Sequence, residues 1–544
     1  MPLLLSEIRL TPDQDTLDLK QVVAGLIQIL SSEIISFRIV RRSIDARQDV
    51  RILYQVEISV PDEDLLLQRL SGTQGLRAER VIPLPVFPII KQSRFDSRPV
   101  VIGFGPAGIF ASLVLARSGA KPIVLERGRR MKERIRDVEV FWSQGAFLPE
   151  SNVCFGEGGA GTFSDGKLTT RKRAPEIPWI LQELVDAGAP FEILYESRPH
   201  IGTDRLRRVI VALHDKIESA GGEVRFNSRM TDLVVRDGAV RGVLVNHQEE
   251  IETGTVILAL GHGAGDTLEA LLAAGVRMEP KPLAVGVRIE HPQDIIDRAQ
   301  YGRWAGHGRL GPSDYRLTFR DSVQGRGAYS FCMCPGGKVI AANAEPESVV
   351  TNGMSAYHRN SGYANSGMVV TIHQDDFGSP QPLSGLAFLR RMEKAAFRMG
   401  GGDYSAPAQR VTDFLRDKTS AALPPVTYRP GVVSADLQGL LPDFVTLSLK
   451  RALHTWGRKI PGFLADEAVM IGIETRTSSP VRILRGEDYA SISVKGLYPV
   501  GEGAGYAGGI VSSALDGVQC IQSILQSKGI KSDESETQKQ GMQR

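Results

Sequence analysis

The sequence predicts an α/β protein in which a Rossmann-type parallel sheet with a β-meander is interrupted by an inserted α+β domain and preceded by a small N-terminal α+β domain. Three observations predict this fold class. A buried strand at 100–102 runs directly into a glycine-rich turn and a helix. A second strand, glycine turn and helix return at 497–523. Two segments before residue 61 alternate apolar and polar residues, as half-buried strands do.

The composition is that of an ordinary globular protein. Of the 544 residues, 42% are hydrophobic and 23% charged, and 65 basic side chains nearly balance 62 acidic ones. This balance argues against a protein whose main task is to coat nucleic acid or a membrane. Four cysteines and no apolar segment of about 18 residues favour a cytoplasmic protein without a metal site or membrane span. Glycine, with 57 residues, exceeds its usual share of about 7%.

Residues 1–95 are expected to form the N-terminal α+β domain, with a ferredoxin-like arrangement. The patterns predict strands at 4–10, 35–39 and 52–60, and helices at 17–30 and near 62–70. A connector containing Pro83, Pro85 and Pro88 should follow. At the other end of the chain, the polar segment 529–544 predicts a disordered tail.

The next segment carries the parts of a dinucleotide-binding site. After the strand at 100–102 come Gly103, Gly105 and Gly108, then a helix and a second strand that ends at Glu126. The glycines permit a tight turn, the close approach of a pyrophosphate, and close packing of helix on strand. The helix N-terminus attracts phosphate, and Glu126 can accept hydrogen bonds from a ribose. A carboxylate would repel a 2′-phosphate, which favours FAD or NAD over NADP.

Two later segments favour FAD over NAD. A buried strand at 255–258 leads to Gly261, and a strand at 497–500 runs into Gly501, Glu502 and a further helix. A strand that ends in glycine and an acid can hold ribityl hydroxyls, while helix N–H groups hold the second phosphate. The FAD-binding domain should therefore span 96–279 and 461–528, and 280–460 should form a substrate domain between its halves. No second nucleotide fingerprint follows, so NAD(P)H would act as a transient reductant at the flavin, or the substrate itself would supply the electrons.

Longer motifs resemble those of a known group of flavoproteins. The segments 156–170, 330–337, 474–482 and 501–510 are similar to those of a largely uncharacterised bacterial family of FAD-dependent, or NAD(FAD)-utilising, dehydrogenases in the glutathione reductase-type superfamily. The resemblance covers roughly residues 1–525 and implies bound FAD and a redox fold, but no particular substrate. It implies an adenine contact near Met230 and ribityl and second-phosphate contacts at Glu502 and 508–510. The commonest superfamily residue at position 502 is Asp.

Motif and resemblance together give a set of candidate cofactor-binding residues from four glycine-rich segments and the strands beside them. They are Gly103, Gly105, Pro106, Ala107, Gly108, Glu126, Arg127, Gly159, Gly161, Thr162, Asp165, Gly166, Met230, Ala259, Gly261, Gly501, Glu502, Gly508, Gly509 and Ile510.

Candidate catalytic residues lie outside these turns. Arg476 could clamp a substrate carboxylate or stabilise charge on a reduced flavin, or it could form a structural salt bridge with Glu474 or a neighbouring domain. Cys334, at period two from Cys332, could be a redox or nucleophilic thiol, or a small buried side chain. His262 could act as an acid or base, or cap a helix.

The leading hypothesis is an FAD-dependent oxidoreductase that transfers a hydride between flavin and an unidentified small organic substrate or nicotinamide. Asp165 and Gly166 faintly resemble a motif of flavin hydroxylases, although much too early in the chain, and leave a flavin monooxygenase-like enzyme open. A third hypothesis is an RNA-associated flavoprotein with a basic N-terminal domain. The basic residues that suggest RNA binding are Arg38, Arg41, Arg42, Arg47 and Arg51. Alternatively, the N-terminal domain could dock on the FAD-binding domain of its own chain or of a second subunit in a homo-oligomer.

Overall fold

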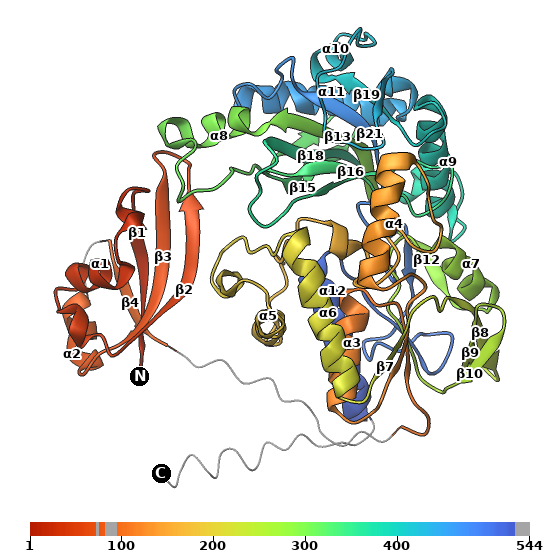
Figure 1. Ribbon diagram of the computed structural model, residues 1–544, viewed down its shortest axis with the longest axis horizontal. Coiled ribbons are helices and arrows are strands. Elements are labelled where there is room, and N and C mark those ends of the chain that lie inside the picture. Colours follow the sequence, from red (N-terminus) through yellow and green to blue (C-terminus); the bar gives the residue numbers. More distant parts are fainter. Residues whose placement is uncertain (72–74, 82–94, 528–544) are drawn as a thin grey trace.

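The computed structural model describes residues 1–71, 75–81 and 95–527. The predicted connector prolines Pro83, Pro85 and Pro88, and the predicted tail 529–544, lie outside the described residues. The predicted fold class is confirmed: a parallel sheet with a β-meander, an inserted domain built on a large sheet, and a small N-terminal α+β domain (Figure 1). Among the described residues no helix is both long and apolar enough to cross a membrane.

The N-terminal domain is a four-stranded antiparallel sheet in the order β2-β3-β1-β4, which is a ferredoxin-like order. Three of its strands were predicted, whereas β4 was not. Helix α1 is shorter than its apolar pattern, because it begins where Asp18 accepts a hydrogen bond from the backbone N–H of Lys20 and ends at Leu26. Its elements are β1 (Leu3–Leu10), α1 (Leu19–Leu26), β2 (Ser36–Asp45), β3 (Arg51–Ser59), α2 (Glu63–Leu70) and β4 (Arg77–Arg80).

The FAD-type domain is built on a five-stranded parallel sheet in the order β23-β11-β5-β6-β7. One face is covered by α3, α5, α6 and α12, whose apolar side chains form a continuous core with the sheet (Figure 1). Helix α3 is buried from Ala107 to Ala116 because other helices cover the side that does not face the sheet. The elements are β5 (Val100–Ile102), α3 (Pro106–Arg117), β6 (Ile123–Leu125), α4 (Met131–Gln144), α5 (Ile177–Asp186), α6 (Thr203–Ser219), β7 (Glu223–Arg225), β11 (Val256–Leu258), β23 (Leu497–Pro499) and α12 (Ile510–Ser527).

The other face of the parallel sheet is covered by the β-meander and one helix. Their apolar side chains pack on Val100, Ile102 and Leu125. A two-stranded ladder of β12 and β22 marks the place where the chain leaves this domain and later returns to it. These elements are β8 (Met230–Arg236), β9 (Ala239–Val245), β10 (Glu249–Glu252), α7 (Gly265–Ala273), β12 (Met278–Pro280) and β22 (Val481–Ile483).

The inserted domain is built on a seven-stranded, mostly antiparallel sheet in the order β14-β15-β18-β13-β21-β19-β20. We predicted that this domain ends at 460, but β21 lies inside its sheet, so it continues to Glu474. The apolar run at 469–473 specifies a buried strand without specifying its partner, β13, far earlier in the chain. The elements are β13 (Leu283–Pro292), α8 (Gln293–Tyr301), β14 (Thr318–Asp321), β15 (Arg326–Cys334), β16 (Lys338–Ala341), β17 (Thr351–Met354), β18 (Tyr363–Ile372), α9 (Ser384–Met399), β19 (Ala406–Arg410), α10 (Val411–Leu415), β20 (Val432–Ser434), α11 (Asp443–Lys459) and β21 (Val469–Glu474).

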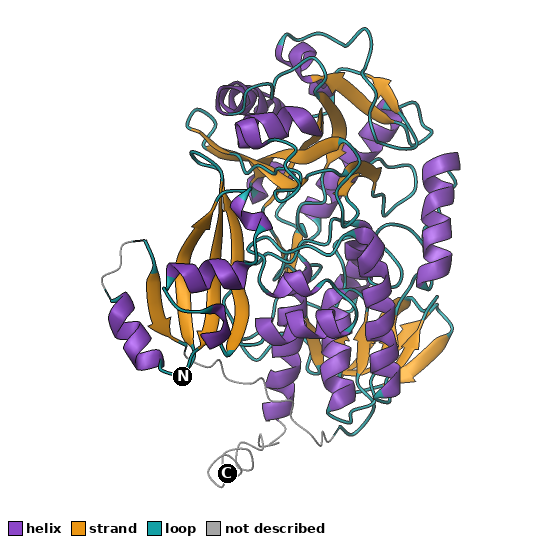
Figure 2. Cartoon of the chain, turned by 60° about the vertical axis from the view of Figure 1, so that its left-hand side comes forward, coloured by secondary structure: helices purple, strands orange, loops and turns teal. Residues whose placement is uncertain are grey.

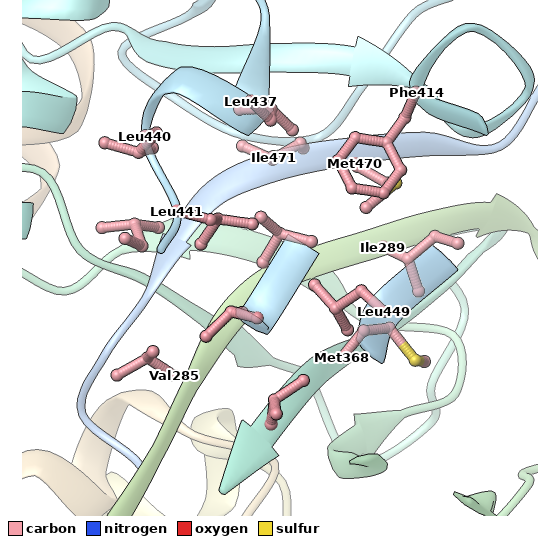
Figure 3. Close-up of a cluster of buried hydrophobic side chains, with 14 of the residues drawn as sticks. Val285, Ile289, Met368, Phe414, Leu437, Leu440, Leu441, Leu449, Met470 and Ile471 are labelled. Carbon is pink, nitrogen blue, oxygen red and sulfur yellow. The ribbon is translucent and has the colours of Figure 1, made fainter. Parts of the chain in front are cut away.

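The core of the inserted domain lies between this sheet and the helices α9 and α11. Figure 3 shows Val285, Ile289 and Met368 from the sheet against Leu449 of α11, with Phe414 and Met470 beside them. A buried ion pair crosses the sheet: the guanidinium of Arg288 donates to the carboxylate of Glu474 at 2.6 and 2.9 Å, and the two side chains are 0% and 2% exposed. Arg288 also donates to the carbonyl of Cys332 at 3.2 Å, which ties the pair to β15.

The N-terminal domain docks against both other domains of its own chain (Figure 2). On β2, the backbone N–H of Arg42 donates to the carbonyl of Tyr195 at 2.8 Å, and its guanidinium donates to Glu196 at 3.0 Å. From the inserted domain, Arg309 donates to Asp15 at 2.8 Å, and Leu310 packs into the N-terminal core.

Most of the arginines on which the RNA hypothesis rested have carboxylate partners within their own chain. Arg38 pairs with Glu57, Arg42 with Glu196, Arg47 with Asp45 and Arg51 with Asp49.

Candidate functional site

A cavity of about 760 Å³ joins the FAD-type domain to the inserted domain. Its wall on one side is the turn that follows β5 and the start of α3, together with the turn that follows β11. On the other side it is lined by Ser330 to Met333 of β15. Ligand sites in open parallel sheets lie at the carboxyl ends of the strands, as here.

Glu126 is held in place at the end of β6. Its buried carboxylate accepts hydrogen bonds from the backbone N–H groups of Phe104, Gly128 and Gly156 at 2.8–2.9 Å. An ionised carboxylate has about four acceptor positions, so these three bonds leave one for a ligand hydroxyl in the cavity. The residue was predicted as a ribose contact, and the structure places it in the cavity wall.

Three cavity-lining glycines have no role in the packing of the chain itself. A Cβ on Gly105 would meet no atom closer than 3.9 Å, and one on Gly261 or Gly508 would meet nothing within 4 Å. None of the three has a positive φ that would demand glycine. The bare backbone therefore leaves room for a ligand at these points, as the close approach of a dinucleotide requires.

Two helices begin at the cavity. Helix α3 starts at Pro106 without a side-chain cap, and α12 starts at Ile510, and both residues line the cavity. The first N–H groups of a helix lack partners within it and attract anions. With the bare glycines and Glu126, these donors fit the two phosphates and the ribose of FAD.

The loop 152–166 lies across the glycine turn and is organised by a fully buried arginine of α4. Arg134 donates to the carbonyls of Asn152, Val153, Glu157 and Gly159 at 2.6–3.0 Å. Gly159 approaches so closely that its Cβ would lie 3.0 Å from the Cα of Gly105. Because Arg134 fixes its conformation, this loop can present its backbone to a ligand beside the glycine turn that follows β5.

Most of the predicted site residues line the cavity. Lining residues are Gly103, Gly105, Pro106, Ala107, Glu126, Arg127, Gly159, Gly161, Asp165, Gly166, Met230, Ala259, Gly261, His262, Arg476, Glu502, Gly508, Gly509 and Ile510.

Four predicted residues lie behind the cavity wall instead. A Cβ on Gly108 would lie 1.9 Å from the carbonyl oxygen of Gly103, so Gly108 serves the packing of α3 on the turn. Gly501 has φ +79°, and its N–H donates to Asp516 at 2.8 Å. Thr162 is fully buried and donates to the carbonyl of Glu157 at 3.0 Å, so it fixes the loop. Cys334 is fully buried beneath Cys332, which does line the cavity.

Arg476 is engaged within the protein. Its guanidinium donates twice to Glu393 at 2.8 Å and once to the carbonyl of His262 at 3.1 Å. The partner is Glu393 of α9 rather than the predicted Glu474, which pairs with Arg288. Only the remaining donors of the guanidinium could reach a ligand. His262 in turn lies 3.4 Å from the carboxylate of Glu502.

A charged cluster that the sequence did not reveal lies at the β15 end of the cavity. The buried carboxylate of Asp165 is 2.9 Å from the ammonium of Lys167 and 2.7 Å from the guanidinium of Arg359. Burial alone would raise the pKa of Asp165, but the two cations lower it below its usual range, so the carboxylate stays ionised. The position of Lys167 directly after the Asp165-Gly166 motif was an available signal; Arg359 had none.

Comparison with known proteins gives two domain matches. Residues 282–477 match the model described as FAD-dependent protein, C-terminal domain-like, and residues 2–61 match a domain of unknown function, DUF8436. An uncharacterised protein of Clostridium beijerinckii is 43% identical over 530 residues, which are 97% of this chain and 99% of the relative.

The chain belongs to the FAD-dependent oxidoreductase family. Its cofactor is FAD.

More distant similarities lie outside this close relationship. Protein FixC of Escherichia coli (strain K12) is 31% identical over 206 residues, which are 37% of this chain and 45% of FixC. Among solved structures, L-proline dehydrogenase from P. horikoshii is 14% identical with a TM-score of 0.31, covering 81% of this chain and 95% of that chain. Glycerol-3-phosphate dehydrogenase from Bacillus halodurans, complexed with FAD, is 12% identical with a TM-score of 0.35, covering 80% and 66%. These TM-scores are low, and the fold is established by the sheet order of this chain itself.

Proposed function

We propose that this protein transfers a hydride between bound FAD and a small anionic organic substrate or a nicotinamide. The observation that carries the proposal is the continuous cavity between the dinucleotide turns and β15 of the inserted domain. Such a cavity lets one chain hold a cofactor by its nucleotide and bring a second molecule to its reactive ring. When bound, FAD supplies the hydride chemistry, while protein groups supply orientation and electrostatics.

The residues that would hold FAD all line the cavity. Glu126 would accept a hydrogen bond from a ribose hydroxyl, and Met230 would contact the adenine. The turn at 103–107 and the N-terminus of α3, with Gly508 to Ile510 at the start of α12, would hold the two phosphates. Glu502 would accept hydrogen bonds from the ribityl hydroxyls.

The charges at the β15 end favour an anionic substrate. Five basic side chains line this part of the cavity, against two carboxylates, so the local field attracts anions. A carboxylate substrate could bind Lys167 or Arg359 while Asp165 keeps both cations oriented. The basic residues are Lys167, Arg171, Arg198, Arg316 and Arg359, and the acids are Asp165 and Asp314.

Anaerobic stopped-flow reduction of the flavin tests the proposed reaction. NADH, NADPH and a panel of small carboxylates are mixed with the holoprotein, and the reduced enzyme is then mixed with oxygen. We expect rapid bleaching of the flavin absorbance by at least one of these donors and slow reoxidation by oxygen. Fast reoxidation that depends on a bound substrate would indicate the monooxygenase instead, and a protein that stays colourless after addition of FAD would overturn both.

Replacing Arg476 by methionine should destabilise the protein and leave the rate of flavin reduction per bound FAD unchanged. The change leaves Glu393, which is 1% exposed, without its cationic partner. Loss of one partner of a buried ion pair lowers the free energy of unfolding by about 3–5 kcal/mol. Urea unfolding measures the loss, and the double variant R476M/E393M is the control that should recover part of it. Slower reduction in a fully stable, FAD-loaded R476M protein would instead assign Arg476 to the substrate.

A further inference from the structure

Two cysteines meet at the wall of the cavity. Cys332 lines it, and Cys334 lies fully buried immediately behind, with its Sγ 3.3 Å from the carbonyl oxygen of Cys332. The ammonium of Lys167 is 3.4 Å from the same Sγ. A cation beside a thiol stabilises the thiolate, which is the reactive form of cysteine.

The backbone at this point departs from a regular strand. The pairing of β15 with β18 shifts register between Phe331 and Cys334, and Cys332 has φ +45°. Cα atoms two residues apart on a regular strand are about 6.7 Å apart, which is close to the upper limit of about 6.8 Å for a disulfide. A non-glycine residue rarely adopts such a φ, and a bulge of this kind re-aims a side chain. Here the bulge presents Cys332 to the cavity while Cys334 stays paired with Asn365.

The surroundings of the two thiols shift their pKa values in opposite directions. The pKa of Cys332 is lowered by hydrogen bonding from Cys334, and further by the charges of Lys167 and Arg288. The pKa of Cys334 is raised by the same hydrogen bond and by burial. The thiolate therefore forms on the residue that faces the cavity.

The other two cysteines, Cys154 and Cys520, both have raised pKa values. Burial raises the pKa of Cys154 to about 11 and raises that of Cys520 as well. Cys520 lies in the apolar core of the FAD-type domain. Neither of them shares the lowered pKa of Cys332, so they serve as internal controls for that residue.

We propose that Cys332 and Cys334 form a redox-active dithiol that exchanges two electrons with the cofactor in the cavity. Starting from the thiolate of Cys332 and the thiol of Cys334, closing the S–S bond breaks one S–H bond and releases two electrons and one proton. Oxidised FAD takes up two electrons and one proton on reduction to its anionic reduced form. When the S–S bond reopens, the thiolate forms again at Cys332, where the charge of Lys167 stabilises it. The inference rests on the proposed FAD site for its electron partner.

Counting electrons tests the pair. Anaerobic titration of the oxidised holoprotein with dithionite should consume four electrons per FAD, two for the flavin and two for the disulfide. The Cys332→Ser and Cys334→Ser variants should each consume two, and Cys154→Ser should still consume four. Two electrons in the wild-type protein would overturn the proposal.

Mass spectrometry gives a second readout that needs neither a variant nor a reducible flavin. Cys332 and Cys334 lie between Arg326 and Lys338, so one tryptic peptide contains both. After air oxidation of the holoprotein and blocking of free thiols, this peptide should be unblocked and lack two hydrogens; two blocked cysteines would overturn the pair. An intact disulfide in a protein whose flavin accepts no hydride would support the pair while contradicting the proposed function.

Discussion

Replacing Gly105 by valine should leave the protein folded and weaken its binding of FAD at least 100-fold, which corresponds to about 2.7 kcal/mol. The backbone at Gly105 is extended, with φ −85° and ψ −175°, a conformation that valine adopts readily before a proline. Its Cβ would meet no protein atom closer than 3.9 Å. The added side chain would therefore occupy the space of the pyrophosphate and little else. Equilibrium dialysis of the apoprotein with FAD measures the loss, and circular dichroism checks the fold.

Two further glycines give matched controls for this variant. Gly254 is exposed, has no positive φ and no atom within 4 Å of a Cβ, so Gly254→Val should bind FAD normally. Gly108→Val should fail to fold, because its Cβ would overlap the carbonyl of Gly103. Normal FAD affinity in a folded G105V protein would contradict the assignment of this turn to the pyrophosphate.

Replacing Arg288 by methionine should lower the free energy of unfolding by about 3–5 kcal/mol. The change leaves the carboxyl group of Glu474, 2% exposed, without its guanidinium partner in the middle of the seven-stranded sheet. It also removes the hydrogen bond to the carbonyl of Cys332, so the bulge loses a support. Urea unfolding followed by tryptophan fluorescence measures the effect, since Trp456 belongs to the same core.

An exposed ion pair and a double variant serve as controls that distinguish the effect of burial from the effect of charge. Arg298 and Asp294 form a pair that is 76% and 59% exposed, and Arg298→Met should cost at most about 1 kcal/mol. In R288M/E474M two apolar side chains replace the buried ions, and much of the stability should return. An R288M protein as stable as R298M would show that the buried pair contributes nothing.

The parts that could be predicted from the sequence are those specified locally. Gly103 to Gly108 and Glu126 follow one another within a single strand, turn, helix and strand. Two consecutive strands of the ferredoxin-like sheet, β2 and β3, likewise follow from alternation of apolar and polar residues.

The remaining features depend on contacts across long stretches of chain. Arg359 meets Asp165 across 194 residues, and no local pattern connects them. Period two predicted that Cys332 and Cys334 share one strand face, but a bulge breaks the period, so Cys332 lines the cavity and Cys334 lies behind it. The partner of Arg476 was also missed, because Glu393 belongs to a helix whose docking only the tertiary fold defines.

The docked N-terminal domain has a consequence for the exchange of the cofactor. Its Arg42 binds Glu196 of the FAD-type domain, and its Asp15 binds Arg309 of the inserted domain. None of its described residues lines the cavity. A movement that separates the FAD-type domain from the inserted domain would break one of these contacts. We therefore expect loss of the contacts of Arg42 and Asp15 to speed the dissociation of FAD, although the described residues of the N-terminal domain lie outside the cavity.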